Sequence, residues 1–415
     1  MSPVFTAAAL VPLVLKIVLG ISLLGTVSSA VFLLMTLVAT TRHRRQARAD
    51  HAAASGTPET ALPPVTILKP LHGMEAELEQ NLESFFHQDY PDYEIIFGAR
   101  DAENPALQIA ERVRARFPQV KSSVVLSGPP TWPNAKVFSL QKMIATSTRA
   151  YFIISDSDVR VAPNFLRNTI PPLLNKKVGL ITCMYRGIPA SDFWSSLEAL
   201  GLSVEMSSGV MVADMLEGMR FALGPAMATR RDALDAIGGI AATADHYSDD
   251  FELGNRIWAK GYKVVLSHHI VNNVLTPRSL WRTLGDQLRW MKSTRYSRPA
   301  GHLGTGLTFA MPFGLLGLVA GMALGHSALG FALFAAAFAN RALQSIVVGW
   351  GVARDPRALT LCWLYPLRDV LGSLIWLGSY TSRRFYWRGE TYRFGKRGRI
   401  TPEHRSTESA SGERR

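Results

Sequence analysis

The sequence is poor in cysteine and in charged residues. Cys183 and Cys362 are the only cysteines among 415 residues, which excludes both a disulfide framework and a metal site built on thiolates. Charged residues make up only 19% of the chain and hydrophobic residues 47%, the reverse of the balance in a disordered chain. Any chemistry must use oxygen and nitrogen groups, on a globular chain with apolar segments or on an integral membrane protein.

An uncharged run near the N-terminus is long enough to cross a bilayer. No charged residue occurs from Ile17 to Ala39, and a helix of that length at 1.5 Å per residue spans the about 30 Å of a hydrocarbon core. A cleaved signal peptide is the alternative, but its apolar region has only roughly 7–15 residues. We therefore expect a membrane anchor over residues 1–41.

A basic linker is expected to follow over residues 42–64. It begins with four arginines, which by the positive-inside rule place the residues after them in the cytoplasm: Arg42, Arg44, Arg45 and Arg48. Much of the formal net charge of +13 thus lies beside the membrane, where an anionic leaflet explains it better than nucleic acid does. No nucleic-acid partner is expected.

Residues 65–277 alternate β-branched runs with helical periodicity, which is typical of a βαβ architecture. The pattern predicts strands at Val65–Leu71, Tyr93–Ala99, Ser123–Leu126, Ala150–Ser155 and Val178–Met184. Apolar residues recur at helical spacing between the first strands. The predicted fold class is α/β, with a mostly parallel sheet covered by helices and with transmembrane helices before and after it. The apolar segment Phe193–Met215 is either an interfacial helix or a core helix.

The C-terminal part is predicted to return to the membrane. Residues 278–302 form an amphipathic helix that is basic on its polar side, and residues 303–380 are apolar, with two or three crossings. Arg368 and Asp369 interrupt the last apolar run, where they either pair or face a polar cavity. A basic tail covers residues 381–415. Its charge favours the cytoplasm, whereas three crossings would place it outside. The alternatives are a re-entrant segment, four short crossings, or a tail that violates the positive-inside rule.

Acidic residues stand at the ends of two predicted strands. Asp156-Ser157-Asp158 follows a continuous hydrophobic strand, and ligands of open α/β sheets bind at the carboxyl ends of strands. Two carboxylates at this spacing can share Mg²⁺ or Mn²⁺. The structural alternative is a turn in which an Asp caps the following helix. Asp101 follows the strand 93–99 and is expected to open onto the same edge; the alternative is a loop Asp before a helix with Pro105 in its first turn.

Two further pairs are candidates for catalysis. Asp249-Asp250 begins a helix, where the macrodipole alone favours acidic residues; the functional interpretation is a base that accepts the proton of an attacking hydroxyl. Arg289-Trp290 places a cation beside a large aromatic side chain where the cytosolic domain meets the bilayer.

An ordered series of motifs runs along the chain, and no single one of them is decisive. The series comprises Leu68-Lys69-Pro70-Leu71-His72-Gly73, Asn81-Leu82-Glu83-Ser84-Phe85-Phe86, Asp89-Tyr90-Pro91, Asp101, Asn134-Ala135-Lys136-Val137, Asp156-Ser157-Asp158, Gly238-Gly239, Asp249-Asp250, Trp387-Arg388-Gly389 and Tyr392-Arg393-Phe394-Gly395. Together they resemble the inverting nucleotide-sugar glycosyltransferases of GT-A fold, in particular the ceramide glucosyltransferase family and its bacterial hopanoid-linked relatives.

The resemblance implies roles for individual residues of the donor site. Asp101 is similar to the acidic residue that contacts uridine, and Lys136 to a donor-site lysine. Asp156 and Asp158 are similar to the carboxylates that bind the metal and the diphosphate.

For catalysis, the resemblance makes Asp250 the base, with Asp249 in place of the Glu that often precedes it. Arg289-Trp290 resemble the end of the (Q/R)-x-x-R-W motif, but position 286 is Asp and Gln287 stands one place late. This departure disfavours a processive polysaccharide synthase.

The resemblance also implies a reaction. A divalent metal, Mg²⁺ or Mn²⁺, would assist the transfer of a hexose, expected to be glucose, from a UDP-sugar to the hydroxyl of a ceramide-like membrane lipid, with inversion. The alternatives are N-acetylglucosamine transfer to a hopanoid polyol, a polyisoprenyl phosphate acceptor, and a non-catalytic nucleotide-sugar binder tethered to the membrane. The expected location is the bacterial inner membrane, as a multi-pass protein with its catalytic domain in the cytoplasm.

Overall fold

An eight-stranded sheet organises the middle of the chain in the computed structural model, which describes residues 7–56, 58–277, 279–387 and 389–403. Its strands are β1 (Val65–Pro70), β2 (Tyr93–Ala99), β3 (Lys121–Leu126), β4 (Tyr151–Ser155), β5 (Val159–Arg160), β6 (Val178–Ile188), β7 (Ala226–Arg230) and β8 (Lys263–Val274). They lie in the order β3-β2-β1-β4-β7-β6-β8-β5. The first four strands in this order are parallel, and so are β6 and β8. Strand β7 is antiparallel to β4 and β6, and β5 to β8.

Both faces of the central strands of this sheet are buried, whereas no residue of the edge strand β3 is. Successive residues of a strand point to opposite faces, so Ile67 packs with α2 and α3 on one side and Leu68 with α4 on the other. The helices of this part are α2 (Leu78–Glu83), α3 (Pro105–Arg116), α4 (Ala135–Thr146), α5 (Phe165–Thr169), α8 (Arg231–Ala236) and α9 (Asp249–Ala259). The predicted α/β class and all five predicted strands are confirmed; β5, β7 and β8 were not predicted.

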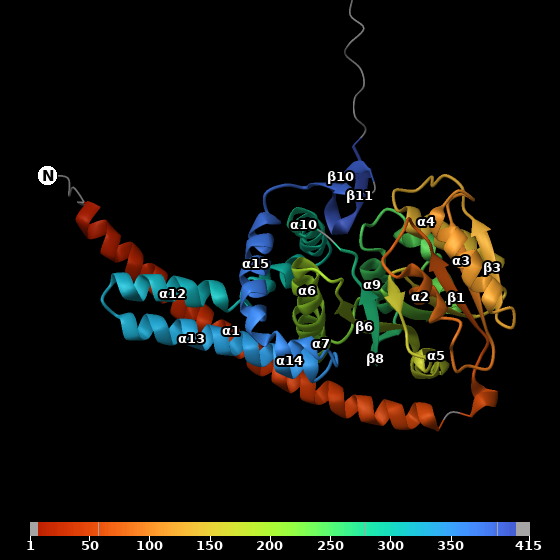
Figure 1. Cartoon of the computed structure of the whole chain (residues 1–415), viewed down its shortest axis with the longest axis horizontal. Helices are drawn as coiled ribbons and strands as arrows, with labels where there is room; N and C mark the ends of the chain where they lie inside the picture. Colours follow the sequence, from red (N-terminus) through yellow and green to blue (C-terminus); the bar gives the residue numbers. More distant parts are fainter. Residues whose placement is uncertain (1–6, 57, 278, 388, 404–415) are drawn as a thin grey trace, which may run out of the picture.

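A second group of helices lies beside the sheet (Figure 1). It consists of α1 (Ala7–Ser55), α6 (Phe193–Leu200), α7 (Ser207–Glu217), α10 (Leu280–Ser297), α11 (Pro299–Thr305), α12 (Met311–Ala323), α13 (Ser327–Gln344), α14 (Arg357–Thr360) and α15 (Tyr365–Gly378). Two π-helical turns, Gly201–Met206 and Ser345–Trp350, continue α6 and α13. Short 3₁₀ helices occur at Glu59–Ala61, Pro171–Leu174, Ile240–Thr243, Cys362–Leu364 and Lys396–Gly398.

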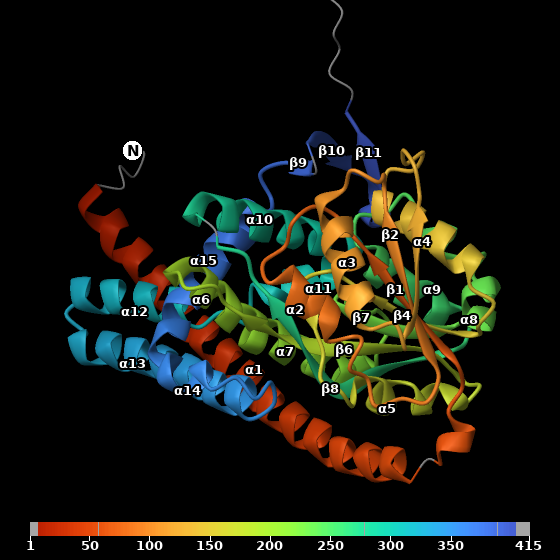
Figure 2. The ribbon, with the colours of Figure 1, turned by 45° about the vertical axis from the view of Figure 1, so that its right-hand side comes forward.

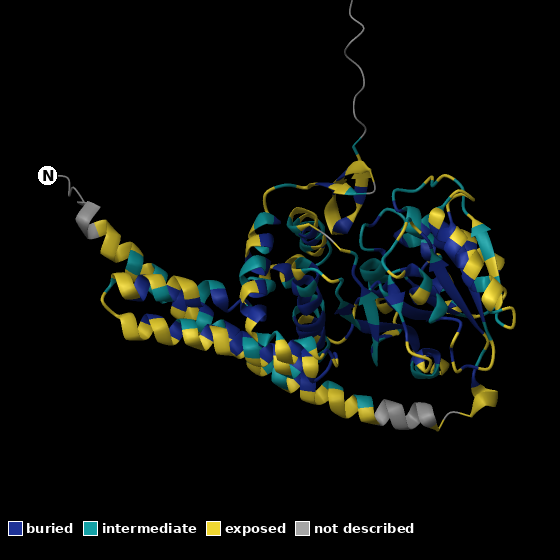
Figure 3. Ribbon diagram, viewed as in Figure 1, coloured by how far each residue is buried: buried dark blue, intermediate teal, exposed yellow. Residues whose placement is uncertain are grey.

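Three helical segments among the described residues are long and apolar enough to cross a membrane: Leu10–Arg48, Phe193–Glu217 and Ser327–Trp350. Helices α12 and α13 run along α1 in both views of the molecule (Figure 2). The backbones of Gly321 and Gly330 come so close that a Cβ on Gly321 would lie 2.9 Å from the Cα of Gly330, as is typical of helix pairs in membranes. Much of α1 and of the α12–α13 hairpin remains exposed (Figure 3).

Two predicted boundaries differ from the structure. Helix α1 continues to Ser55, so residues 42–55 extend the anchor helix; Ala and Arg, both good helix formers, dominate this stretch. In the predicted C-terminal span, residues 365–378 form the short helix α15, in which Arg368 and Asp369 are buried. Residues 1–6, position 278 and residues 404–415, which belong to the predicted anchor, interface helix and tail, lie outside the described residues.

The predicted basic tail contains a small sheet. Strands β9 (Arg384–Trp387), β10 (Glu390–Phe394) and β11 (Ile400–Pro402) form it, in the order β11-β10-β9 and all antiparallel. Its side chains Phe385, Tyr392 and Phe394 are buried together, whereas Tyr386 is exposed. The tail sheet lies against α10 (Figures 1 and 2).

Candidate active site

A cavity of about 1440 Å³ lies between the sheet and the helices beside it. The ends of β1 and β4, the start of α9, and helices α7, α10 and α15 all contribute to its wall, as do Phe32 and Met35 of α1 and Trp387 and Tyr392 of the tail sheet. Pockets for single small ligands measure about 300–1,000 Å³. This cavity therefore has room for more than one substrate.

Asp156 and Asp158 line the cavity where the chain leaves β4. Oδ1 of Asp158 is buried and has no hydrogen-bond partner in the described part of the chain. Burial, the charge of Asp156 and that of Glu75 raise the pKa of Asp158 to about 7. A buried carboxylate with an unused oxygen beside a second carboxylate fits a divalent cation, which would favour its ionised form.

Two carboxylates alone do not fill the coordination sphere of a divalent metal, so the remaining ligands would have to come from a substrate or from water. Across the described residues, no group of three or more His, Cys, Asp or Glu side chains is arranged to hold a metal ion. Mg²⁺ characteristically binds through one or two carboxylates together with substrate phosphates and water. The donor set therefore fits a metal that arrives with a diphosphate.

Two buried lysines surround this pair. Lys69 of β1 donates to the backbone carbonyl of Asp156 and lies 4.0 Å from the ring centre of Phe85; burial lowers its pKa to about 7. Lys136, at the start of α4, is 2.6 Å from Oδ1 of Asp156 and 3.7 Å from Oδ2 of Asp249. Burial disfavours the charge of Lys136, but the carboxylates outweigh it and raise its pKa. The site thus offers positive charge to an anionic ligand.

The carboxylates of Asp249 and Asp250 have different surroundings at the start of α9. Asp249 is buried, and Nδ2 of Asn134 donates to its Oδ1 over 3.3 Å. Asp250 lines the cavity beside Gly224, where a Cβ would lie 3.0 Å from Oδ2 of Asp250. Burial and the charge of Asp249 raise the pKa of Asp250 to about 6, although Lys136 lowers it. Asp250 therefore has the properties of a general base near neutral pH.

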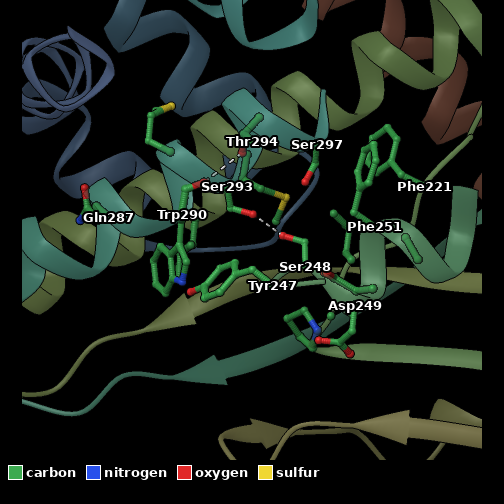
Figure 4. A pocket seen from close by; sticks show the side chains of 18 of the residues that line it. Phe221, Tyr247, Ser248, Asp249, Phe251, Gln287, Trp290, Ser293, Thr294 and Ser297 are labelled. Atoms are coloured by element: carbon green, nitrogen blue, oxygen red, sulfur yellow. Dashed lines mark hydrogen bonds between the residues drawn. The ribbon is translucent and has the colours of Figure 1, made fainter. Parts of the chain in front are cut away.

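Helix α10 closes the cavity opposite α9 with Gln287, Trp290 and Thr294 (Figure 4). Ser293 of this helix and Ser248 are joined by a hydrogen bond of 2.6 Å between their hydroxyls. Arg289 is not among the lining residues: its Nε donates to the hydroxyl of Tyr247 over 2.7 Å, and its NH1 lies 2.7 Å from Asp286. The unexpected Asp at position 286 is thus the ion-pair partner of Arg289.

The tail sheet holds the loop that precedes Asp249. Asp245 forms an ion pair of 3.1 Å with Arg399, and its carbonyl accepts a hydrogen bond from the backbone N–H of Ile400. The ring of Tyr247 packs edge-on against Phe385, Trp387 and Phe394, with ring centres 5.1–5.7 Å apart. The sequence predicts only a basic segment here, because Arg and Lys outnumber the aromatic residues between positions 381 and 399.

The structure thus brings six of the eight predicted site residues together and leaves two apart, Arg289 and Asp101. Asp156, Asp158, Lys136, Asp249, Asp250 and Trp290 line one cavity. Asp101 is exposed in the turn after β2, at the expected edge, but does not line the cavity; its neighbour Arg100 does. Lys69, Asn134 and Tyr247 were not assigned a role from the sequence.

Comparisons with known proteins identify the family of this chain. The family model described as glycosyl transferase family 21 matches residues 26–400. Ceramide glucosyltransferase 1 of Caenorhabditis elegans is 22% identical over 356 residues, which cover 83% of this chain and 74% of the relative. The ceramide glucosyltransferase of Komagataella phaffii is 33% identical over 113 residues, or 26% of this chain and 22% of the relative.

Among solved structures, a mannosyltransferase from Pyrobaculum calidifontis in complex with GDP-Man and Mn²⁺ is similar over 85% of this chain and 98% of its own, with a TM-score of 0.47 and 18% identity. The sequence match over nearly the whole chain confirms the resemblance to the ceramide glucosyltransferase family. The chain is a membrane glycosyltransferase that belongs to glycosyl transferase family 21.

Proposed function

We propose that this protein transfers a hexose, expected to be glucose, from a UDP-sugar to the hydroxyl of a ceramide-like membrane lipid, with inversion at the anomeric carbon. One observation carries the proposal: a pair of strand-end carboxylates and a carboxyl with a raised pKa line one cavity that also reaches apolar helices. The names of the family's curated relatives support the choice of donor sugar and acceptor.

In this proposal the donor's diphosphate lies near Asp156, Asp158, Lys69 and Lys136. Asp156 and Asp158 would hold a divalent metal, which when bound stabilises the charge of the leaving group as a Lewis acid. The ammonium group of Lys136 lies between Asp156 and Asp249 and contributes a second positive charge. These charges favour the transition state because the leaving diphosphate gains negative charge there.

Asp250 would act on the acceptor. Its carboxylate takes the proton from the lipid hydroxyl while the hydroxyl oxygen bonds to the anomeric carbon. The bond from that carbon to the diphosphate oxygen breaks, and UDP leaves with the electron pair. A single displacement inverts the anomeric centre. Asp249, held by Asn134 and Lys136, is in our proposal a positioning residue for Asp250.

The cytoplasmic location of the site is part of the proposal. Arg42 and Arg44 lie where α1 meets the rest of the molecule and donate to the carbonyls of Met215 and Gly351. Both carbonyls lie at the C-terminal ends of apolar helices. By the positive-inside rule this end faces the cytoplasm, where UDP-sugars are available.

The test is an assay of the full-length protein in vesicles. UDP-glucose or UDP-N-acetylglucosamine is offered with ceramide or with bacteriohopanetetrol, with and without EDTA, and the lipids are identified by mass spectrometry. We expect a glucosylated ceramide that disappears with EDTA and in Asp250→Asn. Asp235→Asn, a change on the exposed side of α8, is the matched control and should keep full activity. UDP-sugar binding without any glycolipid would refute the proposal in favour of a non-catalytic binder.

A further inference from the structure

The cavity contains a buried cation whose donors are only partly used. Arg368 of α15 is 9% exposed, and its NH2 group lies 3.0 Å from Oε2 of Glu205. Its Nε and NH1 groups are buried and have no hydrogen-bond partner in the described part of the chain. Because an unpaired buried donor is costly and rare in native proteins, this arrangement indicates that a ligand supplies the acceptors.

Two glycines allow the guanidinium group to pack closely against the backbone. A Cβ on Gly201 would lie 2.5 Å from Nε of Arg368, and one on Gly372 would lie 3.0 Å from NH1. Both glycines line the cavity together with Arg368 and Glu205. Gly201 also begins the π-helical turn that carries Glu205, and such turns often occur at functional sites. The guanidinium group thus packs directly over both glycines at the wall of the cavity.

The charges around Arg368 disfavour an anionic ligand. Three carboxylates line this part of the cavity, those of Glu198, Glu205 and Asp369, against the two guanidinium groups of Arg341 and Arg368. Arg341 is paired with Asp369 over 3.3 Å, and Asp369 also accepts from the backbone N–H groups of Ala310 and Met311. No surplus of positive charge is left for a phosphate group.

The walls near Arg368 suit a lipid. Val210 and Ala213 of α7, Phe309, and Ile375 of α15 contribute apolar surface to the same cavity. Asp250 lines this cavity too. A chain-bearing molecule thus finds apolar contacts, hydrogen-bond donors at Arg368 and a base at Asp250 within one continuous space.

We propose that Arg368 and Glu205 form the subsite that binds the polar head of the acceptor, and that this acceptor is an uncharged lipid. The N–H groups of Arg368 donate to carbonyl or hydroxyl oxygens next to the reacting hydroxyl, and Glu205 accepts from a neighbouring O–H or N–H group. The subsite rests on the proposed function and deepens it, since it selects a neutral amide or polyol lipid over a polyprenyl phosphate.

The test separates acceptor binding from donor binding. Arg368→Lys keeps the charge near Glu205 but loses the fork of donors, and Gly372→Ala presses on the guanidinium group without removing it. With a short-chain fluorescent ceramide as acceptor, we expect both variants to raise the acceptor KM about tenfold or more. The KM for UDP-glucose and its slow hydrolysis without acceptor should change less than twofold. Arg282→Lys, on the exposed surface of α10, is the matched control.

Four results would overturn the proposal. An unchanged acceptor KM in both variants, with normal transfer by the wild type, refutes the subsite alone. Equal increases in donor KM and acceptor KM would show that Arg368 supports the structure of the whole site and does not bind the acceptor specifically. Transfer by the wild type to a C55 polyprenyl phosphate in preference to the ceramide refutes the uncharged acceptor. A wild type that hydrolyses UDP-glucose but glycosylates none of these lipids refutes the proposed function and this subsite together.

Discussion

Transfer should become strongly pH-dependent near pH 6 if Asp250 is the base. Burial and the neighbouring Asp249 raise the pKa of Asp250 to about 6, and Lys136 opposes this shift. Only the ionised carboxylate accepts a proton, so activity is present above this pKa and is lost as the pH falls through it. At saturating Mn²⁺, Asp158 is expected to stay ionised despite its own raised pKa. Lys69, with a pKa of about 7, gains positive charge over the same range, which favours binding of the diphosphate, so a loss of activity on acidification is assigned to Asp250.

The magnitude follows from the pKa. With a pKa of about 6, the ionised fraction of Asp250 falls about tenfold between pH 8 and pH 5, whereas an unperturbed Asp with a pKa of about 3.9 would lose less than about 10% over the same range. Initial rates of UDP release by the reconstituted protein measure this, with saturating donor, acceptor and metal. Intrinsic fluorescence at each pH checks that the protein stays folded.

A second variant tests the cause of the shift. Because the cation of Lys136 lowers the pKa of Asp250, Lys136→Met should move the midpoint of the pH profile upward, whatever its effect on the maximal rate. A rate that stays within twofold from pH 8 to pH 5 would refute the assignment of Asp250 as the base. A midpoint that moves downward in Lys136→Met would refute the electrostatic explanation.

Three other variants test separate parts of the site. Asp158→Asn should raise the Mn²⁺ concentration for half-maximal activity at least roughly tenfold. It should not lower the thermal midpoint, because it removes a buried negative charge that lies near the charge of Asp156. A lowered thermal midpoint with normal metal dependence would contradict this. In Gly224→Ala the new methyl group contacts Oδ2 of Asp250 and should lower kcat about tenfold to a hundredfold, with little change in donor KM. An unchanged kcat would show that the Asp250 side chain can shift without loss of activity. Tyr247→Phe leaves Nε of Arg289 without its hydrogen-bond acceptor and should lower the free energy of unfolding in detergent by ~1 kcal/mol. An unchanged denaturation midpoint would show that water accepts this hydrogen bond in place of the Tyr247 hydroxyl.

The sequence predicted those parts of the fold in which local pattern and tertiary packing agree. The strands β1, β2 and β4 are short β-branched runs that both faces of the sheet bury, so their hydrophobic pattern was sufficient. Strand β7 is as deeply buried, but Ala226–Arg230 has no β-branched run to mark it. In β8 two histidines interrupt the pattern. No local pattern shows that β7 is inserted antiparallel between β4 and β6.

The site was predictable where chemistry depends on neighbours in sequence, as for Asp156, Asp158 and the Asp249-Asp250 pair. It was not predictable where residues far apart meet. Glu205 and Arg368 are separated by most of the C-terminal half, and the role of Tyr247 depends on aromatic residues of the tail sheet. These contacts arise from the packing of helices and sheets, which a single sequence does not specify by pattern alone.

The wall of the cavity contains side chains from both ends of the described chain, Phe32 and Met35 near the start and Trp387 and Tyr392 near the end. During synthesis, domains generally fold from the N-terminus onward, yet this site cannot close until residues 384–402 have left the ribosome and docked on α10. Until this sheet has docked, a nascent chain inserted into the membrane lacks one wall of the cavity. For the same reason, a soluble fragment limited to residues 65–277 would fold its sheet but would not form the cavity.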